Sequence, residues 1–383
     1  MKQNTKKMKR LKFISYALLM GMAMMLLATS CDENPEVTTQ QDLLPENLRV
    51  KIPSSITHTA NATGGRMSGR TNDDMLQGNN IYEHLGNFIA IGDAAAEIAE
   101  EIVIGLHKYK IDRILSLSYT SDDDNRVKNL VVESNVEFEG KLWEYELTVT
   151  DAESEGNPDG GKAMQVFWNK ERPIMGISII KPYNADRGNN SEMGDGIIRI
   201  DYTEVSTKGY DAEMEVFISN LPTPSPLEDP YAMSTLHMFA GRKGDVVDVY
   251  GNSNHPNAIL FAGNTGFNWA FVASGSDPKE IGVAEVGLPP SSLDVSDRNV
   301  LLKDYSIKNV FTNEINAVWP GLDPTLLAMY LQNTSAPGYF NNKEGFLSGG
   351  ISPGPEWDVF ASRLENLSPY NPLETSNLVV LFK

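Results

Sequence analysis

A two-residue alternation of apolar and polar side chains, repeated along most of the chain, constrains the fold more than any other feature. In residues 143–149, and again in 267–271, the large apolar residues fall on one face of an extended segment. A strand with one apolar face buries that face against a core, so the pattern predicts a large sheet. Similar segments occupy 132–138, 164–168, 174–180, 197–202, 214–218, 246–250 and 281–286.

Turn-forming residues separate the predicted strands, as in 122–125, 155–161, 187–190 and 222–226. These connections are too short for a helical crossover, so consecutive strands should pair antiparallel. The sequence therefore predicts a mainly β fold of the α+β kind, built on a curved antiparallel meander sheet or a barrel.

A long helix is predicted at the N-terminal side of this sheet, from residue 80 to about residue 110. Asn80 and Glu83 have the spacing of a capping box, and Lys108 lies where a helix C-terminus favours positive charge. Apolar residues recur between them at spacings of three and four. Gly92 and the alanines after it make the middle of this stripe small, so we expect the sheet to approach the helix closely.

The amino-acid pattern changes in the tail of the chain, where Gly and Pro separate short periodic segments. Residues 324–331 and 356–367 predict two short helices, and 377–382 predict a last strand. Nearer the N-terminus, the alternation in 48–52 predicts an edge strand.

These patterns predict four segments along the chain. They are a signal peptide (1–30), a flexible acidic and polar tether (31–79), a helix plus antiparallel β domain (80–299), and a mixed helix and loop extension packed on that domain (300–383).

The first thirty residues have the order of a secretory signal peptide. Residues 1–12 hold six cations and no acid, and an apolar run over 13–27 follows them. The small residues Ala28, Thr29 and Ser30 then precede Cys31, which is the only cysteine of the chain. A transmembrane anchor is the alternative, but it needs about 20 apolar residues and no small-residue exit.

The stretch Ala28-Thr29-Ser30-Cys31 resembles the lipobox of bacterial lipoproteins of the Bacteroidetes type, although Ala28 stands where Leu is commonest. The resemblance implies that the Cys31 sulfur carries a diacyl group and that acyl chains such as palmitate anchor the protein in a membrane. Asp32 and Glu33 resemble the export signal of those lipoproteins. They imply the outer membrane, with the outer cell surface favoured over the periplasmic face.

The charge and cysteine content exclude several classes of protein. A net charge of −19 argues against a nucleic-acid partner, because phosphates are held by Lys and Arg. Removal of residues 1–30 lowers the net charge to −25, so attachment to a membrane must depend on the acyl chains at Cys31. A single cysteine forms no internal disulfide, Cys-ligated zinc site or iron–sulfur cluster.

Two motifs imitate functional sites. Residues 350–354 match the Gly-x-Ser-x-Gly pattern of an esterase, but Pro353 has no N–H for an oxyanion, and no strand-to-helix context is predicted. Residues 151–156 begin like a calcium loop, yet Lys162 occupies the position of the bidentate Glu. We predict a hairpin turn there, with weak Ca²⁺ binding by this loop or by 122–124 as the alternative.

The histidines give no sign of a metal or catalytic site. None of the five forms a His-x-x-x-His pair, and no Gly-rich phosphate loop follows a strand. His84 and His107 are expected on the surface of the long helix. His237 is expected to face the interior of the barrel in a hydrogen-bonded, structural role. The sequence thus predicts no catalytic residue, no metal ligand and no cofactor.

Aromatic and amide residues are frequent in the loops and tail. We interpret them as core, with a sugar-binding surface as the alternative, because a sugar stacks on rings and bonds to amides. They are Tyr231, Trp269, Trp319, Tyr330, Tyr339, Phe340, Asn341, Asn342, Phe346, Trp357 and Tyr370.

The function predicted from the sequence is binding without catalysis. A lipid-anchored cell-envelope protein would use the curved sheet to bind a small or apolar ligand or another envelope component. The alternatives are a glycan-acting hydrolase, which needs two carboxylates about 5 to 9 Å apart, and a glycan-binding accessory protein.

Overall fold

The computed structural model describes residues 49–57, 78–108, 114–169, 171–191, 193–225, 229, 231–258 and 266–383. The predicted signal peptide, Cys31, the acidic pair Asp32 and Glu33, and most of the tether lie outside these ranges, so those assignments stay predictions. Among the described residues, no helix has both the length and the apolar character needed to span a bilayer.

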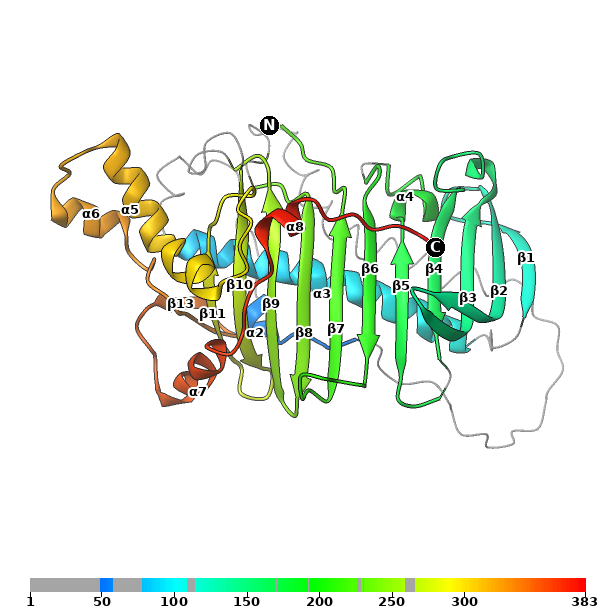
Figure 1. The fold of residues 1–383 in the computed structure, drawn as a ribbon, viewed down its shortest axis with the longest axis horizontal. Coiled ribbons are helices and arrows are strands. Elements are labelled where there is room, and N and C mark those ends of the chain that lie inside the picture. The colour runs from blue at the N-terminus through cyan, green and yellow to red at the C-terminus, as the bar shows by residue number, and fades with distance from the viewer. Residues whose placement is uncertain are drawn as a thin grey trace. The chain divides into compact units, whose positions relative to one another are not determined.

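The fold is mainly antiparallel β, with 36% strand against 26% helix. Its thirteen strands follow one another as a meander, in the order β1 to β13 (Figure 1). The meander is not closed, because β1 and β13 end the strand order and do not pair with each other. The predicted meander is therefore present, and the barrel prediction is wrong.

The chain divides into two compact units, of which the first holds Ala94–Ser206 and Val380–Lys383 together with Arg49. Each of its strands pairs antiparallel with the next. The short elements η2 (Ala152–Ser154) and α4 (Pro182–Ala185) lie in its connections. The strands are β1 (Leu115–Thr120), β2 (Val127–Phe138), β3 (Lys141–Asp151), β4 (Lys162–Trp168), β5 (Met175–Ile180) and β6 (Ile197–Thr203).

The second unit holds Val50–Asp93 and Thr207–Val379. Its strands are β7 (Ala212–Ser219), β8 (Thr235–Lys243), β9 (Val246–His255), β10 (Phe267–Ser276), β11 (Ile281–Gly287), β12 (Gly338–Asn341) and β13 (Gly345–Gly349). Its helical elements are α2 (Ser54–Thr57), the first half of α3 (Gly78–Lys108), η4 (Val300–Asp304), α5 (Ile307–Val318), α6 (Pro324–Tyr330), α7 (Pro355–Leu364) and α8 (Pro372–Ser376).

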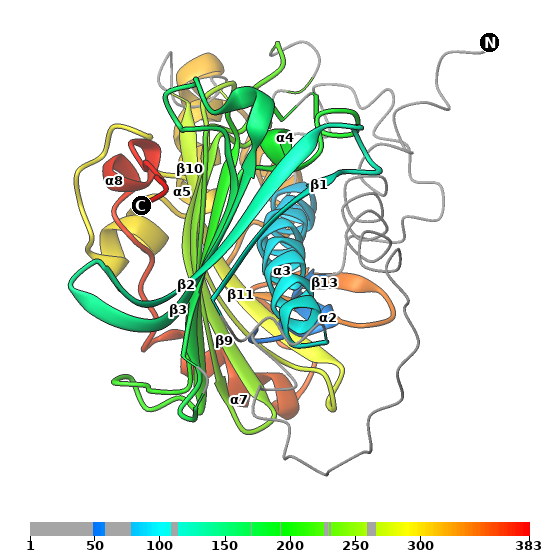
Figure 2. The ribbon, with the colours of Figure 1, turned by 90° about the vertical axis from the view of Figure 1, so that its right-hand side faces the viewer.

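Helices cover both faces of the strands in the second unit. In Figure 2, α2 and α3 lie on one face and α8 on the other. The α3 side is packed closely, because a Cβ atom on Gly92 would lie 2.4 Å from Cε of Met238 in β8. His84 of α3 is buried against Tyr231 and Trp269, so its predicted surface position is wrong. The side chain of His107 is outside the described part.

The opposite face carries a second apolar cluster. Phe360 and Leu364 of α7 pack with Val272 of β10 and Val283 of β11. Burial of such side chains contributes about 1.5–3 kcal/mol each to folding. This is why the sheet of the second unit is a middle layer and not a surface layer.

Several local predictions from the sequence need correction. The predicted helices correspond to α6 and to α7, which ends at Leu364. Residues 377–382 form no strand, and neither do the described residues of 48–52. Arg49 instead pairs with Glu97 and Glu100 of α3, and the N–H of Ile52 donates to Asp93. Alternation alone does not distinguish a strand from an extended segment that packs without a neighbouring strand.

Candidate ligand pocket

Polar side chains line the face of β9 and β10 that lies away from α3, and they are buried. The segment 363–377, here called the C-terminal strap, covers them. Tyr370 donates its N–H to Asn252 at 2.7 Å, and Ser376 bonds to both Asn254 and Asn268. The strap thus replaces water as the partner of a polar sheet face, which satisfies groups that are costly to bury unpaired.

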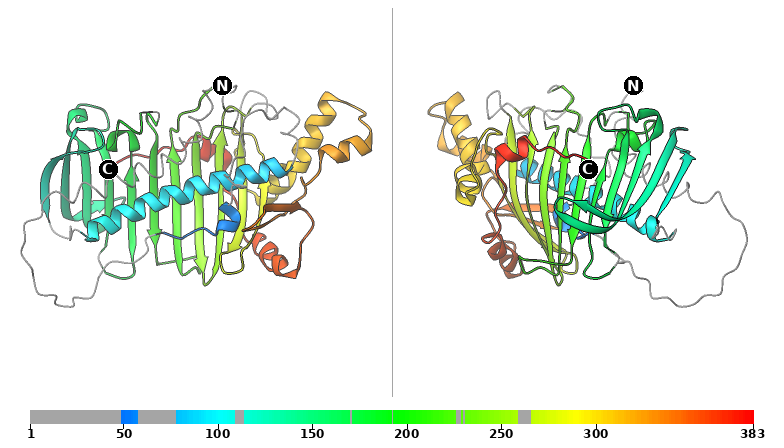
Figure 3. Two further views of the ribbon diagram at one scale, coloured as in Figure 1. Left: turned by 180° about the vertical axis from the view of Figure 1, so that it is seen from behind. Right: turned by 45° about the vertical axis from the view of Figure 1, so that its right-hand side comes forward.

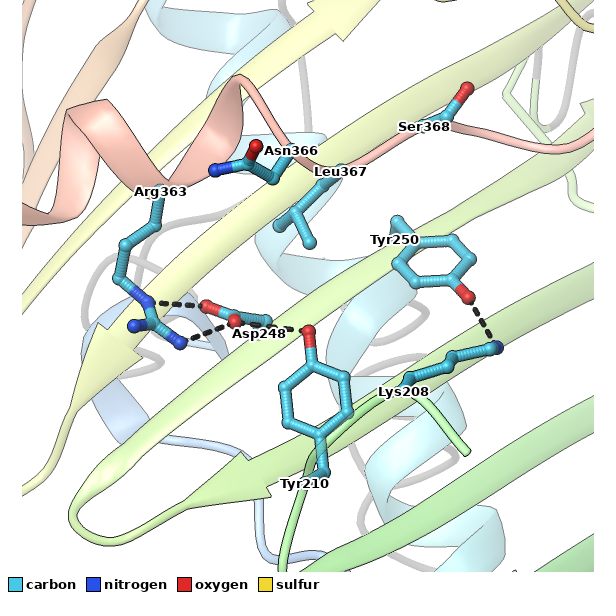
Figure 4. Close-up of a pocket in the computed structure, with 8 residues that line it drawn as sticks. All are labelled: Lys208, Tyr210, Asp248, Tyr250, Arg363, Asn366, Leu367 and Ser368. Carbon is cyan, nitrogen blue, oxygen red and sulfur yellow. Dashed lines mark hydrogen bonds and ion pairs between the residues drawn. The ribbon is translucent and has the colours of Figure 1, made fainter. Parts of the chain in front are cut away.

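A pocket of about 430 Å³ lies where the strap begins. Two of its residues precede β7, two belong to β9, one belongs to α7 and three belong to the strap beyond α7. Figure 4 shows these eight side chains around the opening. They are Lys208, Tyr210, Asp248, Tyr250, Arg363, Asn366, Leu367 and Ser368.

Asp248 forms the floor of the pocket and is fully hydrogen-bonded. Its Oδ1 accepts from Arg363 Nε at 3.0 Å and from Ser274 Oγ at 2.7 Å. Its Oδ2 accepts from Arg363 Nη2 at 2.5 Å and from Tyr210 Oη at 3.1 Å. The side chain is 5% exposed, whereas that of Arg363 is 33% exposed. A carboxylate held by a bidentate guanidinium is fixed in position.

Tyr210 lies flat on the sheet because β8 has a glycine beneath it. A Cβ atom on Gly241 would lie 2.7 Å from the Tyr210 ring. Burial, together with the charge of Asp248, raises the pKa of Tyr210 above its ordinary value. The phenol therefore stays protonated and acts as a hydrogen-bond donor.

Lys208 and Tyr250 form the opposite wall. The ammonium group donates to the Tyr250 hydroxyl at 2.7 Å, and it lies 3.9 Å from the centre of the Phe239 ring. This contact holds a positive charge against aromatic faces. The two walls thus bring two phenols and two cations to one opening (Figure 4).

Next to the pocket, Glu215 and His237 bind Tyr370 of the strap. The Tyr370 hydroxyl donates to Glu215 Oε1 at 2.7 Å, and His237 Nε2 lies 2.7 Å from the same oxygen. The rings of His237 and Tyr370 stack at 3.5 Å. Burial alone would raise the pKa of Glu215, but these two hydrogen bonds hold it below its ordinary value. His237 is thus hydrogen-bonded, as predicted, although it faces the strap and not the interior of a barrel.

The Gly-x-Ser-x-Gly segment does lie between a strand and a helix, β13 and α7, contrary to the sequence prediction. It still lacks the parts of an esterase site. Pro353 has no N–H, and Ser352 Oγ donates to the carbonyl of Gly354 at 3.0 Å. The sequence argument against a nucleophile elbow therefore stands on Pro353 and not on its context.

Cationic side chains pair with the carboxylate of Asp151, which begins the calcium-like motif after β3. Asp151 is buried and accepts from Arg126 at 2.8 Å, and Lys128 Nζ lies 3.7 Å away. In the neighbouring acidic run, Asp124 pairs with Lys128 at 2.9 Å. Among the described residues, no cluster of His, Cys, Asp or Glu has the arrangement of a metal site.

The prediction that the aromatic residues belong to the core holds only for some of them, and Tyr231, Phe346, Trp357 and Tyr370 are partly buried. Trp269, Tyr339 and Phe340 are buried, whereas Trp319 and Tyr330 are exposed. Of the residues singled out in the sequence, Tyr370 and His237 lie beside the pocket. The pocket residues themselves escaped prediction because polar positions on an alternating strand read as solvent-facing.

Comparisons of the chain with protein-family models, with curated proteins and with solved structures find no match. The pocket residues are therefore the basis for a functional proposal.

Proposed function

We propose that the chain is a lipid-anchored, non-catalytic protein of the cell envelope that binds a small hydroxylated ligand in the pocket around Asp248. The resemblance of the N-terminal segment to lipoproteins supports an acyl anchor at Cys31 in the outer membrane. The acidic pair Asp32 and Glu33 supports the outer cell surface.

The side chains that line the pocket indicate the chemical class of the ligand. Of the eight lining residues, only Leu367 has a purely aliphatic side chain. Two tyrosine rings, an amide and a hydroxyl face one opening, which is the combination that saccharides use through ring stacking and hydrogen bonds. An apolar ligand would remove water from the charged and polar atoms of the pocket wall without giving them new hydrogen bonds, so a saccharide is favoured over the apolar ligand that the sequence suggested.

Hydrolysis of a glycan is disfavoured by the state of the nearby carboxylates. A glycosidase needs one carboxyl group that is protonated near neutral pH. Asp248 is locked by Arg363, and the pKa of Glu215 is held low by His237 and Tyr370. Both groups therefore support ligand binding without bond cleavage.

Native mass spectrometry of the mature protein, purified from its own membrane, tests both parts of the proposal. We expect a mass with acyl chains on Cys31 and a saccharide that co-purifies. The Cys31→Ser variant should lose the acyl mass and keep the saccharide. Recovery of an apolar ligand, or of an unmodified Cys31 in the aqueous fraction, would contradict the corresponding part.

Saccharide arrays then test the pocket. Tyr250→Ala should lower saccharide affinity by up to about tenfold, since a ring contact contributes about 0.5–1.5 kcal/mol beyond the area it buries. Trp357→Phe is the matched aromatic control, because Trp357 lies outside the pocket lining.

A further inference from the structure

The helical hairpin of α5 and α6 carries a group of exposed apolar side chains, here called the apolar tip. The first part of α5 is anchored, because Ile307, Phe311 and Ile315 are buried. Beyond these residues burial ends. The tip consists of Val318 (63% exposed), Trp319 (50%), Leu326 (47%), Met329 (59%) and Tyr330 (37%).

Helix α6 is unusual in that it buries none of its residues. Its sequence, PTLLAMY, is nevertheless strongly apolar. Asp323 caps it by accepting from the N–H groups of Thr325 at 2.8 Å and Leu326 at 3.4 Å. Helices this short depend on packing for their stability, and exposed apolar patches mark interaction surfaces. The tip therefore has the properties of an interaction surface, one that is buried when the protein performs its function.

We propose that the apolar tip inserts into the interfacial layer of a lipid bilayer. Tryptophan and tyrosine are enriched at the boundary between the polar headgroups and the hydrocarbon of a bilayer, and in the tip they lie beside aliphatic side chains. Between Trp319 and Leu331 the only charged side chain is Asp323, and its carboxylate already caps α6. The hairpin projects away from β10 and β11, which leaves the tip accessible (Figures 1 and 3).

This inference rests on the proposed function, because the acyl chains at Cys31 bring the bilayer within reach. Eighteen residues separate Cys31 from Arg49, the first described residue. At 3.3–3.6 Å per residue such a segment spans at most about 60 Å. An acyl anchor on the same chain raises the effective concentration of the tip at the membrane surface.

The net charge indicates which bilayer the tip prefers. Without residues 1–30 the chain carries a net charge of −25, so anionic headgroups repel it. Insertion must then depend on the burial of apolar area, which is insensitive to salt. We expect binding to phosphatidylcholine vesicles that is unchanged by salt and weakened when phosphatidylglycerol is added.

Vesicle flotation of the full mature chain with Cys31→Ser, which removes the acyl chains, measures this step alone. The double variant Leu326→Glu/Met329→Glu should lower the vesicle-bound fraction about tenfold or more. Val359→Glu is the matched control, because Val359 is 57% exposed on α7 of the same unit and lies outside the tip. It should leave binding unchanged, and circular dichroism should show both variants folded.

A second readout uses Trp319 directly. Addition of vesicles should shift the tryptophan fluorescence to shorter wavelength, and Trp319→Phe should abolish the shift. Absence of vesicle binding, or an equal loss in the Val359→Glu control, would overturn the proposal. So would self-association that the tip variant abolishes without any vesicle binding, because the occupant would then be a second copy of the chain.

Because Cys31→Ser lacks the anchor, failure of vesicle binding refutes only the tip. Failure of acylation in the wild-type protein refutes the anchor instead.

Discussion

Two buried aspartates, one in each unit, illustrate how the same side chain serves different purposes. Asp151 in the first unit has no exposed side-chain surface and lies among Arg126, Lys128 and Arg187. Asp248 in the second unit is held by one half-buried arginine and by Tyr210 at the floor of a pocket. A closed network contributes to stability, whereas an open one presents its partners to a ligand.

Removal of the closed carboxylate should have the largest effect. Asp151→Ala leaves the surrounding cations without their common partner, and breaking a buried ion pair costs about 3–5 kcal/mol. Urea denaturation should show this loss in the free energy of unfolding. Asp122→Ala, at an exposed aspartate of the same unit, is the control. A loss below about 1 kcal/mol for Asp151→Ala would show that the network is not a stabilising one.

Acid should break the same network by degrees. Burial alone would raise the pKa of Asp151, but hydrogen bonds from Arg126 and Ser154 hold it below the ordinary value, and the pKa of Asp124 is also lowered. Groups with a lowered folded-state pKa stabilise the protein above their unfolded pKa, about 3.9, and that stability is lost as pH falls further. The free energy of unfolding should therefore decrease as the pH falls below about 4. Asp151→Asn should flatten this dependence, and an unchanged profile would contradict the assignment.

At the pocket around Asp248, we expect saccharide affinity to depend on the position of the Tyr210 ring more than on the stability of the protein. Gly241→Ala places a methyl group against this ring, and such overpacking costs about 1–3 kcal/mol. We expect saccharide binding to fall as far as in Tyr210→Ala, measured by calorimetric titration. Gly156→Ala is the matched control, since no atom lies within 4 Å of its added Cβ. If Gly241→Ala binds saccharide with the affinity of the wild type, Tyr210 is not part of the binding site.

Lys208 should show the smallest effect on stability. Lys208→Met keeps much of the aliphatic chain over Phe239, so the free energy of unfolding should change by at most about 0.5 kcal/mol. Saccharide affinity should still fall, because the charge and the bond to Tyr250 are lost. Lys303→Met, at an exposed lysine outside the pocket, should change neither quantity. Equal affinity of the Lys208 variant and the wild type would separate Lys208 from ligand recognition.

Much of the strand pattern was predictable, because alternation reflects the local geometry of an extended backbone. The nine alternating segments predicted for the main sheet all fall within or overlap strands of the structure, whereas the predicted strands at 48–52 and 377–382 have no counterpart among the described residues. Strand β8 was not among them, since Leu236 and Met238 face α3 while Phe239 is buried on the other face. A strand buried on both faces loses its period of two.

The burial of the polar face of β9 could not be predicted from the local sequence. Asn252 and Asn254 alternate with small or apolar residues, a pattern typical of a surface exposed to water. They are buried because the strap, more than a hundred residues later, supplies their hydrogen bonds. No local window of sequence contains that partner.

The sequence by itself determined the positions of most strands, the absence of an oxyanion donor at Pro353 and the resemblance of the N-terminal segment to lipoproteins. Each depends on neighbours in the chain or on the chemistry of one residue type. Only the tertiary structure decided that Asp248 meets Arg363, 115 residues away, and that the tip of α6 stays uncovered. Such pairings depend on how distant segments pack, which no local pattern of side chains records.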